Sequence, residues 1–278
     1  MTTATRPTTG VSRTAVIIAQ ARATEDARPD RLFADPLAAH LVDAVGWIQV
    51  ADAGRMNQEY FALRTRFFDD HLQAAAAAGC TQVVLLAAGL DTRAFRLTWP
   101  DGTQLFEVDL PALVAFKEAV LRARRATPAC DRVVLPVDLR DDWRSALVDA
   151  GFDPEQPTAW LVEGLLMYLD TGANDTLLAE LGELSAPGSS LGFEHANQAY
   201  VDLPQMQEVW RRLERFNATW SSTLDDPVAW AARHGWDAQV TTADELAERH
   251  GRPVPPLTDP ALVGDARMWL VEATRSDR

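Results

Sequence analysis

Apolar residues recur at helical spacing through the first part of the chain. A helix places residues three and four positions apart on one face, and this pattern runs through three segments before it stops at Gly79. We expect a helical cap over 11–79, preceded by a disordered tail at 1–10, which has no apolar core. The three segments are 12–26, 31–45 (broken at Pro36) and 58–79.

From residue 80 onward, short and continuously apolar runs alternate with amphipathic segments. Continuous apolar runs are typical of parallel strands buried on both faces, and the alternation with helices predicts a Rossmann-like α/β fold. The expected strands are 81–89, 103–109, 132–138, the beginning of 158–169, and 189–195. The expected helices between them are 90–97, 111–125, 141–151 and 171–188.

The last part of the chain departs from this rhythm. A helix at 225–235 is followed by a short strand, a helix that ends at Gly251, a proline-rich loop at 252–260 and a final strand at 265–275. We expect the two last strands to lie at one edge of the sheet. The prediction is therefore a seven-stranded, mostly parallel sheet with helices on both faces.

The chain is long enough for one large domain. We expect a single domain over 11–278, in which the core is 80–278 and an insertion of about 196–222 follows the fifth strand.

Composition excludes several classes of protein. The 278 residues carry 40 acids and 26 Lys or Arg, a net charge of −14, and the one dense basic stretch, 122–125, is typical of a helix end. No apolar run approaches the roughly 18 residues needed to span a bilayer. The two cysteines, Cys80 and Cys130, form no disulfide framework and suit a reducing compartment. We expect a cytoplasmic protein that binds neither nucleic acid nor membrane; the sequence indicates no oligomeric state.

Small or acidic residues stand where successive strands end. Gly89 ends the first strand, Asp109 follows it by 20 residues at the end of the second, and Asp138 and Glu163 end the third and fourth. Ligands of doubly wound sheets bind at these carboxyl ends, and an acid at this spacing suits a ribose diol. Each acid alone could equally be the N-cap of the next helix. The ends of all four strands, however, should lie at the same edge of the sheet.

The corner after the first strand argues against a dinucleotide. It reads Ala87-Ala88-Gly89-Leu90-Asp91-Thr92, with one glycine in place of a Gly-x-Gly-x-x-Gly motif and with Asp91 where a pyrophosphate would lie. A nicotinamide dehydrogenase is therefore disfavoured. A nucleoside without phosphate fits better, and S-adenosylmethionine, with its positive sulfonium, is such a ligand.

The chain resembles the leucine carboxyl methyltransferase-like family of S-adenosylmethionine-dependent methyltransferases. Its bacterial branch includes carboxyl methyltransferases of polyketide pathways similar to the tetracenomycin one. The resemblance covers about 11–274 and implies a class I methyltransferase fold. It rests on the segments SRTAVIIAQARATE, ALRTRFFDD, LLAAGLDTRAFRL, FEVDLPALVAFKEAVL, PVDLRDDW and VEGLLMYL.

The resemblance also implies cofactor-binding residues. Gly89 would lie beneath the methionine part of S-adenosylmethionine, Asp109 would bind the ribose, and Arg64 would bind the carboxylate, a geometry that suits a guanidinium. Arg66 is the alternative if the alignment slips, and Arg22 is a second cation. Asp138 and Leu139 would contact the adenine, and Glu163 would lie near the amino group. The full expected set is Arg64, Ala88, Gly89, Asp109, Leu110, Asp138, Leu139 and Glu163.

One position departs from the family pattern. The usual Gly-Ala-Gly corner is Ala87-Ala88-Gly89 here. The methyl group of Ala87 is expected to be tolerated if its φ is negative.

The residues around the methyl acceptor are the hardest to assign. His195, at the end of the fifth strand, is a candidate general base or acceptor-binding donor, or else a structural histidine. Tyr168 and Tyr200 are candidate acceptor-binding residues. Three further aromatic residues could line the same pocket or belong to the core: Trp210, Phe216 and Trp220. No His or Cys pair has the spacing of metal ligands.

These observations together predict an O-methyltransferase. Its acceptor would be a small molecule of secondary metabolism, methylated on a carboxylate, which is already a nucleophile at neutral pH, or on a phenol, which benefits from a base. The alternative is a catalytically silent protein that binds S-adenosylmethionine as a sensor or scaffold.

Overall fold

The computed structural model describes residues 11–47, 57–215 and 218–276. A seven-stranded sheet in the order β3-β2-β1-β4-β5-β7-β6 forms its centre. The first five strands pair in parallel, and β7 runs antiparallel to both of its neighbours. The strands are β1 (Gln82–Leu86), β2 (Gln104–Asp109), β3 (Asp131–Pro136), β4 (Thr158–Val162), β5 (Ser190–Ala196), β6 (Trp236–Thr241) and β7 (Met268–Arg275).

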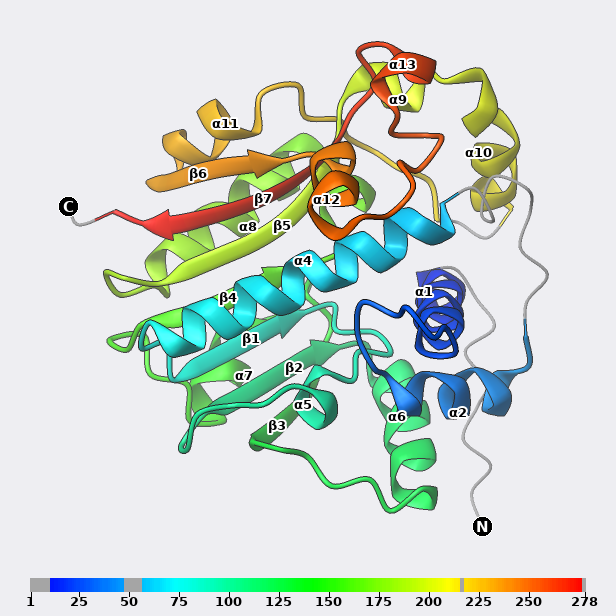
Figure 1. Cartoon of the computed structure of the whole chain (residues 1–278). Helices are drawn as coiled ribbons and strands as arrows, with labels where there is room; N and C mark the ends of the chain where they lie inside the picture. Colours follow the sequence, from blue (N-terminus) through cyan, green and yellow to red (C-terminus); the bar gives the residue numbers. More distant parts are fainter. Residues whose placement is uncertain (1–10, 48–56, 216–217, 277–278) are drawn as a thin grey trace.

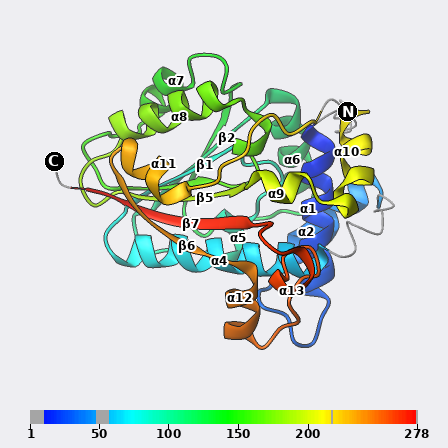
Figure 2. The ribbon, with the colours of Figure 1, turned by 90° about the horizontal axis from the view of Figure 1, so that it is seen from above.

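Helices cover both faces of this sheet. The long helix α4 packs across one face together with α12, and α7, α8 and α11 pack on the other, as Figures 1 and 2 show. The helices are α4 (Gln58–Ala77), α5 (Arg93–Arg96), α6 (Pro111–Ala123), α7 (Trp143–Asp149), α8 (Thr171–Glu183), α11 (Pro227–Arg233), α12 (Ala243–His250) and α13 (Pro260–Val263), with a 3₁₀ turn, η1, at Leu166–Tyr168.

The central strands are buried because both faces are covered. Every residue of β1, β4 and β5 is buried, which explains why β1 and β4 are almost entirely apolar. The prediction of a Rossmann-like, mostly parallel sheet of seven strands is confirmed, and β6 and β7 form one edge of it.

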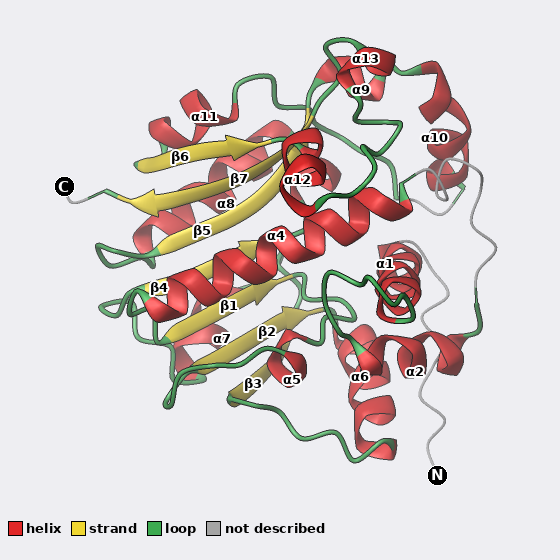
Figure 3. Ribbon diagram, in the orientation of Figure 1, coloured by secondary structure: helices red, strands yellow, loops and turns green. Residues whose placement is uncertain are grey.

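Two further groups of helices lie at the carboxyl ends of the parallel strands. Helices α1 (Val11–Asp26) and α2 (Pro36–Val45) pack against each other there, and α2 also contacts α6. The segment after β5 contributes α9 (Gln198–Val201), the 3₁₀ turn η2 (Pro204–Met206) and α10 (Gln207–Glu214). Figure 3 shows both groups beside the strand ends. The carboxyl edge of the sheet is therefore enclosed.

Several observed boundaries differ from the predicted ones. The segment 31–45 is helical only from Pro36, where Asp35 caps the helix by accepting a hydrogen bond from the Ala38 N–H. The segment 90–97 forms only one helical turn, α5, after which the backbone is extended at Leu97. The helix expected at 171–188 ends at Glu183, and the strand expected at 81–89 ends at Leu86. No helix among the described residues is both long and apolar enough to cross a membrane.

Candidate active site

The turn after β1 approaches β2 through its backbone. Gly89 has a φ of +55°, and its N–H donates to Asp109 Oδ2 at 2.5 Å. A Cβ added to Gly89 would lie 3.4 Å from the Cβ of Ala15 on α1. Glycine thus suits this position both by its conformation and by the close approach of the helix above it.

Ala87 does not meet the condition of a negative φ under which its methyl group was expected to be tolerated. Its φ is +50°, in the left-handed region that a Cβ disfavours. The turn therefore holds one alanine in a conformation that glycine adopts more readily.

A cavity of about 790 Å³ lies at the carboxyl edge of the sheet. Segments from α1 to β7 line it, so residues far apart in the sequence meet around one space. The structure brings the predicted cofactor and acceptor residues together in its lining: Arg64, Ala88, Gly89, Asp109, Leu110, Asp138, Leu139, Glu163, Tyr168 and Tyr200.

Asp109 is oriented by backbone N–H groups. Oδ2 accepts from Gly89, and Oδ1 accepts from the N–H of Leu110 at 2.6 Å. Burial raises the pKa of Asp109, and the two hydrogen bonds oppose that shift. Each oxygen keeps a lone pair for a ligand hydroxyl in the cavity.

Asp138 lies at a more open part of the cavity. Arg140, which is 86% exposed, donates to both carboxylate oxygens, and this hydrogen bonding lowers the pKa of Asp138. Asp138 is therefore ionised and able to accept a hydrogen bond from an exocyclic amine.

Glu163 joins two buried arginines. Its Oε1 lies 3.0 Å from Arg64 Nε, and its Oε2 accepts from Arg93 Nη1 at 2.8 Å. Burial would raise the pKa of Glu163, but the two guanidinium groups outweigh it and lower the pKa. Arg93 also pairs with Asp91 and with Asp69, so it connects the turn after β1 to α4.

These contacts belong to a longer series, which we call the buried ion-pair chain. It runs from α1 to the end of β5, and each side chain in it is at most 13% exposed. In order of contact its members are Arg22, Asp35, Arg96, Asp69, Arg93, Glu163, Arg64 and Glu194, and Asp91 branches from Arg93. The chain thus contains five carboxylates and four guanidinium groups.

Glu194 is a cavity residue that the sequence analysis missed. It is fully buried, its Oε1 pairs with Arg64 Nη1 at 2.5 Å, and its Oε2 accepts from the Tyr60 hydroxyl at 2.7 Å. Burial raises its pKa, which Arg64 opposes. The available signal was a glutamate inside a strand expected to be buried, SLGFEHA, since an unpaired charge is rarely buried.

His195, the predicted catalytic residue, does not line this cavity. Successive side chains of a strand point to opposite faces, so the register that turns Glu194 toward Tyr60 and Arg64 turns His195 away. Its Nδ1 accepts from the N–H of Ala196 at 2.9 Å, and its Nε2 lies 3.2 Å from Ser222 Oγ. Burial lowers the pKa of His195 to about 4.

The alternative cations lie in other surroundings. Arg66 donates to Asp70 at 2.9 Å and to the Leu32 carbonyl, and it is not a lining residue. Arg22 does line the cavity, but its guanidinium binds Asp35 and the Leu90 carbonyl. Arg64 is thus the better placed of the three.

Aromatic rings line the part of the cavity beneath α10. Trp220 stacks with Tyr200 at 6.3 Å, lies edge-on to Tyr168 at 6.4 Å, and contacts Trp210 at 4.8 Å between ring centroids. The Tyr168 hydroxyl hydrogen-bonds Thr14 of α1. Phe216 falls outside the described residues. We call this part of the cavity, lined by Tyr168, Tyr200, Trp210 and Trp220, the aromatic chamber. Glu194 lines the same cavity.

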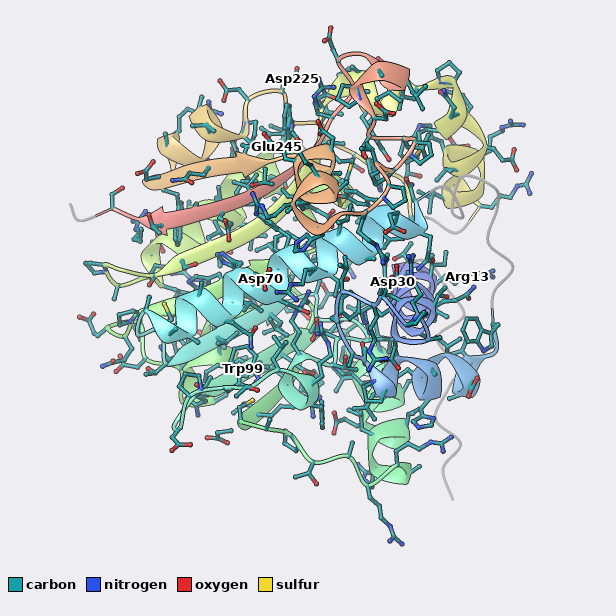
Figure 4. The ribbon with its side chains drawn as sticks, viewed as in Figure 1. Arg13, Asp30, Asp70, Trp99, Asp225 and Glu245 are labelled. Carbon is teal, nitrogen blue, oxygen red and sulfur yellow. The ribbon has the colours of Figure 1, made fainter. Side chains whose placement is uncertain are left out.

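The cavity offers arginines and carboxylates but few groups of intermediate basicity. Among its described lining residues there is neither histidine nor lysine. In the described part of the chain no cluster of His, Cys, Asp or Glu could hold a metal ion. Arg13 and Arg215 also line the cavity, and Figure 4 labels Arg13 on α1, beside the strand ends.

Comparison with known proteins gives a consistent family. The model of the leucine carboxyl methyltransferase family matches residues 15–182. A protein of Frankia alni named as an S-adenosyl-L-methionine-dependent methyltransferase is 47% identical over 267 residues, which cover 93% of this chain and 95% of that protein. One of the same description from Streptomyces coelicolor is 45% identical and covers 88% of this chain and 89% of its own.

Solved structures share the fold at low sequence identity. A DUF574 family protein from Streptomyces avermitilis has a TM-score of 0.62 at 15% identity and covers 96% of this chain and 98% of its own. Magnesium protoporphyrin IX methyltransferase from Synechocystis, with bound S-adenosylhomocysteine, has a TM-score of 0.51 at 12% identity, with 86% and 93% of the two chains covered.

Proposed function

The chain belongs to the leucine carboxyl methyltransferase family and is an S-adenosyl-L-methionine-dependent methyltransferase; on that premise, we propose that it methylates an oxygen atom of a small-molecule acceptor. The observation that supports this most is the continuity of one cavity, from the carboxyl ends of β1, β2 and β4 into the aromatic chamber. One end suits the cofactor and the other an apolar acceptor, as methyl transfer requires.

The residues of the first end fit S-adenosylmethionine. Asp109 presents both oxygens to a ribose diol, Asp138 suits the adenine amine beside Leu139, and Gly89 lies in the cavity lining next to Asp109. Glu163 and Arg64 offer opposite charges to the amino and carboxylate groups. Ala88 and Leu110 complete the walls. The cofactor supplies an electrophilic methyl group; the protein binds and orients the two reactants and excludes water.

Within oxygen acceptors, the site favours a carboxylate. A carboxylate needs no base at neutral pH, and no histidine or lysine is present in the described lining. Arg13 and Arg215 line the cavity and could hold such a group. Tyr168 and Tyr200 would pack against the acceptor's apolar body. A phenol is the second candidate, and it would require Glu194 to accept a proton.

Secondary metabolism is the setting we propose, because the aromatic chamber is suited to a planar, apolar compound such as a polyketide. A silent sensor is not favoured, since the relatives are named as methyltransferases.

Methyl transfer can be tested with S-adenosylmethionine that carries a labelled methyl group. The purified protein is incubated with a panel of planar aromatic carboxylic acids and the matching phenols. We expect labelled product from the acids, and mild base should release it as methanol because it is an ester. Base-stable product from the phenols would support an ether. No product from either group would contradict oxygen methylation of this acceptor class.

A further inference from the structure

The buried ion-pair chain has an excess of one negative charge. Its five carboxylates face four guanidinium groups, and all of them are nearly excluded from solvent. A buried charge without a full counterion is costly, typically by several kcal/mol. A ligand that brings a positive charge into the adjoining cavity would relieve this cost.

Glu194 is the cavity end of this chain. Only Arg64 pairs with it among the described ion pairs, and Arg64 is shared with Glu163. The other groups that face its carboxylate are neutral donors: the Tyr60 hydroxyl from α4 and the backbone N–H of Gly164 after β4. Neutral donors orient a carboxylate and spread its charge, but they do not cancel it. Glu194 therefore carries part of the excess negative charge of the chain and lies against the cavity.

The methyl donor and its product differ in charge at the reacting centre. S-adenosylmethionine carries a sulfonium, an ammonium and a carboxylate, and thus one net positive charge. Loss of the methyl group converts the sulfonium into a neutral thioether, so S-adenosylhomocysteine has no net charge. Of the two ligands, only the donor carries a net positive charge, which would balance the excess negative charge of the buried ion-pair chain.

We propose that Glu194 is a specificity-determining residue that makes the cavity prefer the sulfonium donor over its thioether product. This rests on the proposed placement of the cofactor among Gly89, Asp109 and Glu163. The preference weakens product binding after each methyl transfer, when the positive charge has left the cofactor. Glu194 does this through the negative charge of its carboxylate.

The decisive variant is Glu194→Gln, which keeps the shape and removes the charge. Titration calorimetry would measure dissociation constants for S-adenosylmethionine and S-adenosylhomocysteine. We expect affinity for the donor to fall about tenfold or more while affinity for the thioether changes by less than about threefold, since only the donor loses an opposite charge. Glu25→Gln is the control, because Glu25 is equally buried and ion-paired, with Arg252, but does not line the cavity.

Equal losses for both ligands would overturn the proposal and indicate that Glu194 only holds Arg64 in place. No change for either would also overturn it, and would point to another cavity residue, such as Arg13, as the source of balance.

A second measurement, on the unaltered protein, covers the case in which Glu194→Gln does not fold. Sinefungin carries a protonated amine in place of the methylated sulfonium. We expect it to bind at least about threefold more tightly than the neutral thioether, and equal or weaker binding would contradict the proposal. If neither donor nor thioether bound at all, the cofactor placement itself would be wrong. Absence of methyl transfer with binding intact would affect only the proposed acceptor.

Discussion

At the scale of single residues, the carboxylate of Asp109 is fixed before any ligand binds. Two backbone N–H groups hold it, and its burial leaves the rest of its hydrogen-bonding capacity to the cavity. The sequence predicted this residue from its distance to Gly89, because the length of one strand-turn-strand unit brings both to the same edge.

Asp109→Asn should weaken binding of S-adenosylmethionine by about 10–100-fold. An amide has only one oxygen, so its NH2 group must face one of the two backbone N–H groups, of Gly89 or Leu110, that the carboxylate accepts from. A hydrogen bond to a charged group, worth about 1.5–3 kcal/mol, is therefore lost. Calorimetric titration measures the change. Asp131→Asn, an exposed acid at the start of β3, is the control and should leave affinity within about twofold.

Ala87 gives a second prediction at this scale. Because the φ of Ala87 is +50°, Ala87→Gly should raise the free energy of unfolding by up to about 1 kcal/mol. The substitution relieves the strain of a Cβ in the left-handed region, and the larger entropy of glycine in the unfolded chain offsets part of that gain. Urea unfolding measures this. The neighbouring Ala88→Gly, at a residue whose φ is not positive, should be destabilising instead. A loss of stability in Ala87→Gly would contradict the argument.

At the scale of elements, the docking of α1 and α2 depends on Asp35. This fully buried residue accepts from Arg22 at 2.7 Å and from the Thr92 hydroxyl at 2.7 Å, and it caps α2. It therefore links the two cap helices to the turn after β1.

Asp35→Ala should lower the free energy of unfolding by about 3–5 kcal/mol, because it leaves Arg22 buried without its partner. Chemical unfolding followed by circular dichroism measures the loss. Asp142→Ala removes an exposed helix cap that accepts from Ser145, and it should cost only about 1 kcal/mol. Similar losses in both variants would mean that Asp35 acts only as a cap.

The fifth strand explains why the sequence pointed to His195 and missed its neighbour Glu194, which lines the cavity. Both Glu194 and His195 stand at the end of β5, but strand alternation gives them opposite faces. The sequence marked the strand end correctly. It could not tell which of the two side chains faces the cavity, because that depends on the packing of α4 against the sheet.

Buried His195 predicts a pH dependence of stability. Its pKa is about 4 in the folded protein and about 6.5 in the unfolded chain, so the unfolded state binds more protons as pH falls from 7 to 5. Proton uptake by the unfolded state therefore lowers the free energy of unfolding as pH falls below about 6.5. We expect a decrease of about 1–2 kcal/mol between pH 7 and 5. Urea unfolding at both values tests it: His195→Asn should show a smaller loss than the parent, and an equal loss would contradict the assignment.

At the scale of the whole molecule, the sequence could predict the sheet but not the buried ion-pair chain. Continuous apolar runs report burial on both faces, which is a local signal. The charged partners come from separate segments between Arg22 and Glu194, and their pairing depends on how the cap sits on the sheet. The cavity at the carboxyl edge of the sheet is likewise a property of the assembled fold.

The central claim is that this cavity binds S-adenosylmethionine at the carboxyl ends of the parallel strands. A crystal structure of the protein grown with S-adenosylhomocysteine tests it most directly. We expect ribose hydroxyls at hydrogen-bond distance from Asp109, adenine beside Asp138 and Leu139, and the amino-acid end between Glu163 and Arg64. A nucleoside bound elsewhere, or one whose ribose does not contact Asp109, would contradict it.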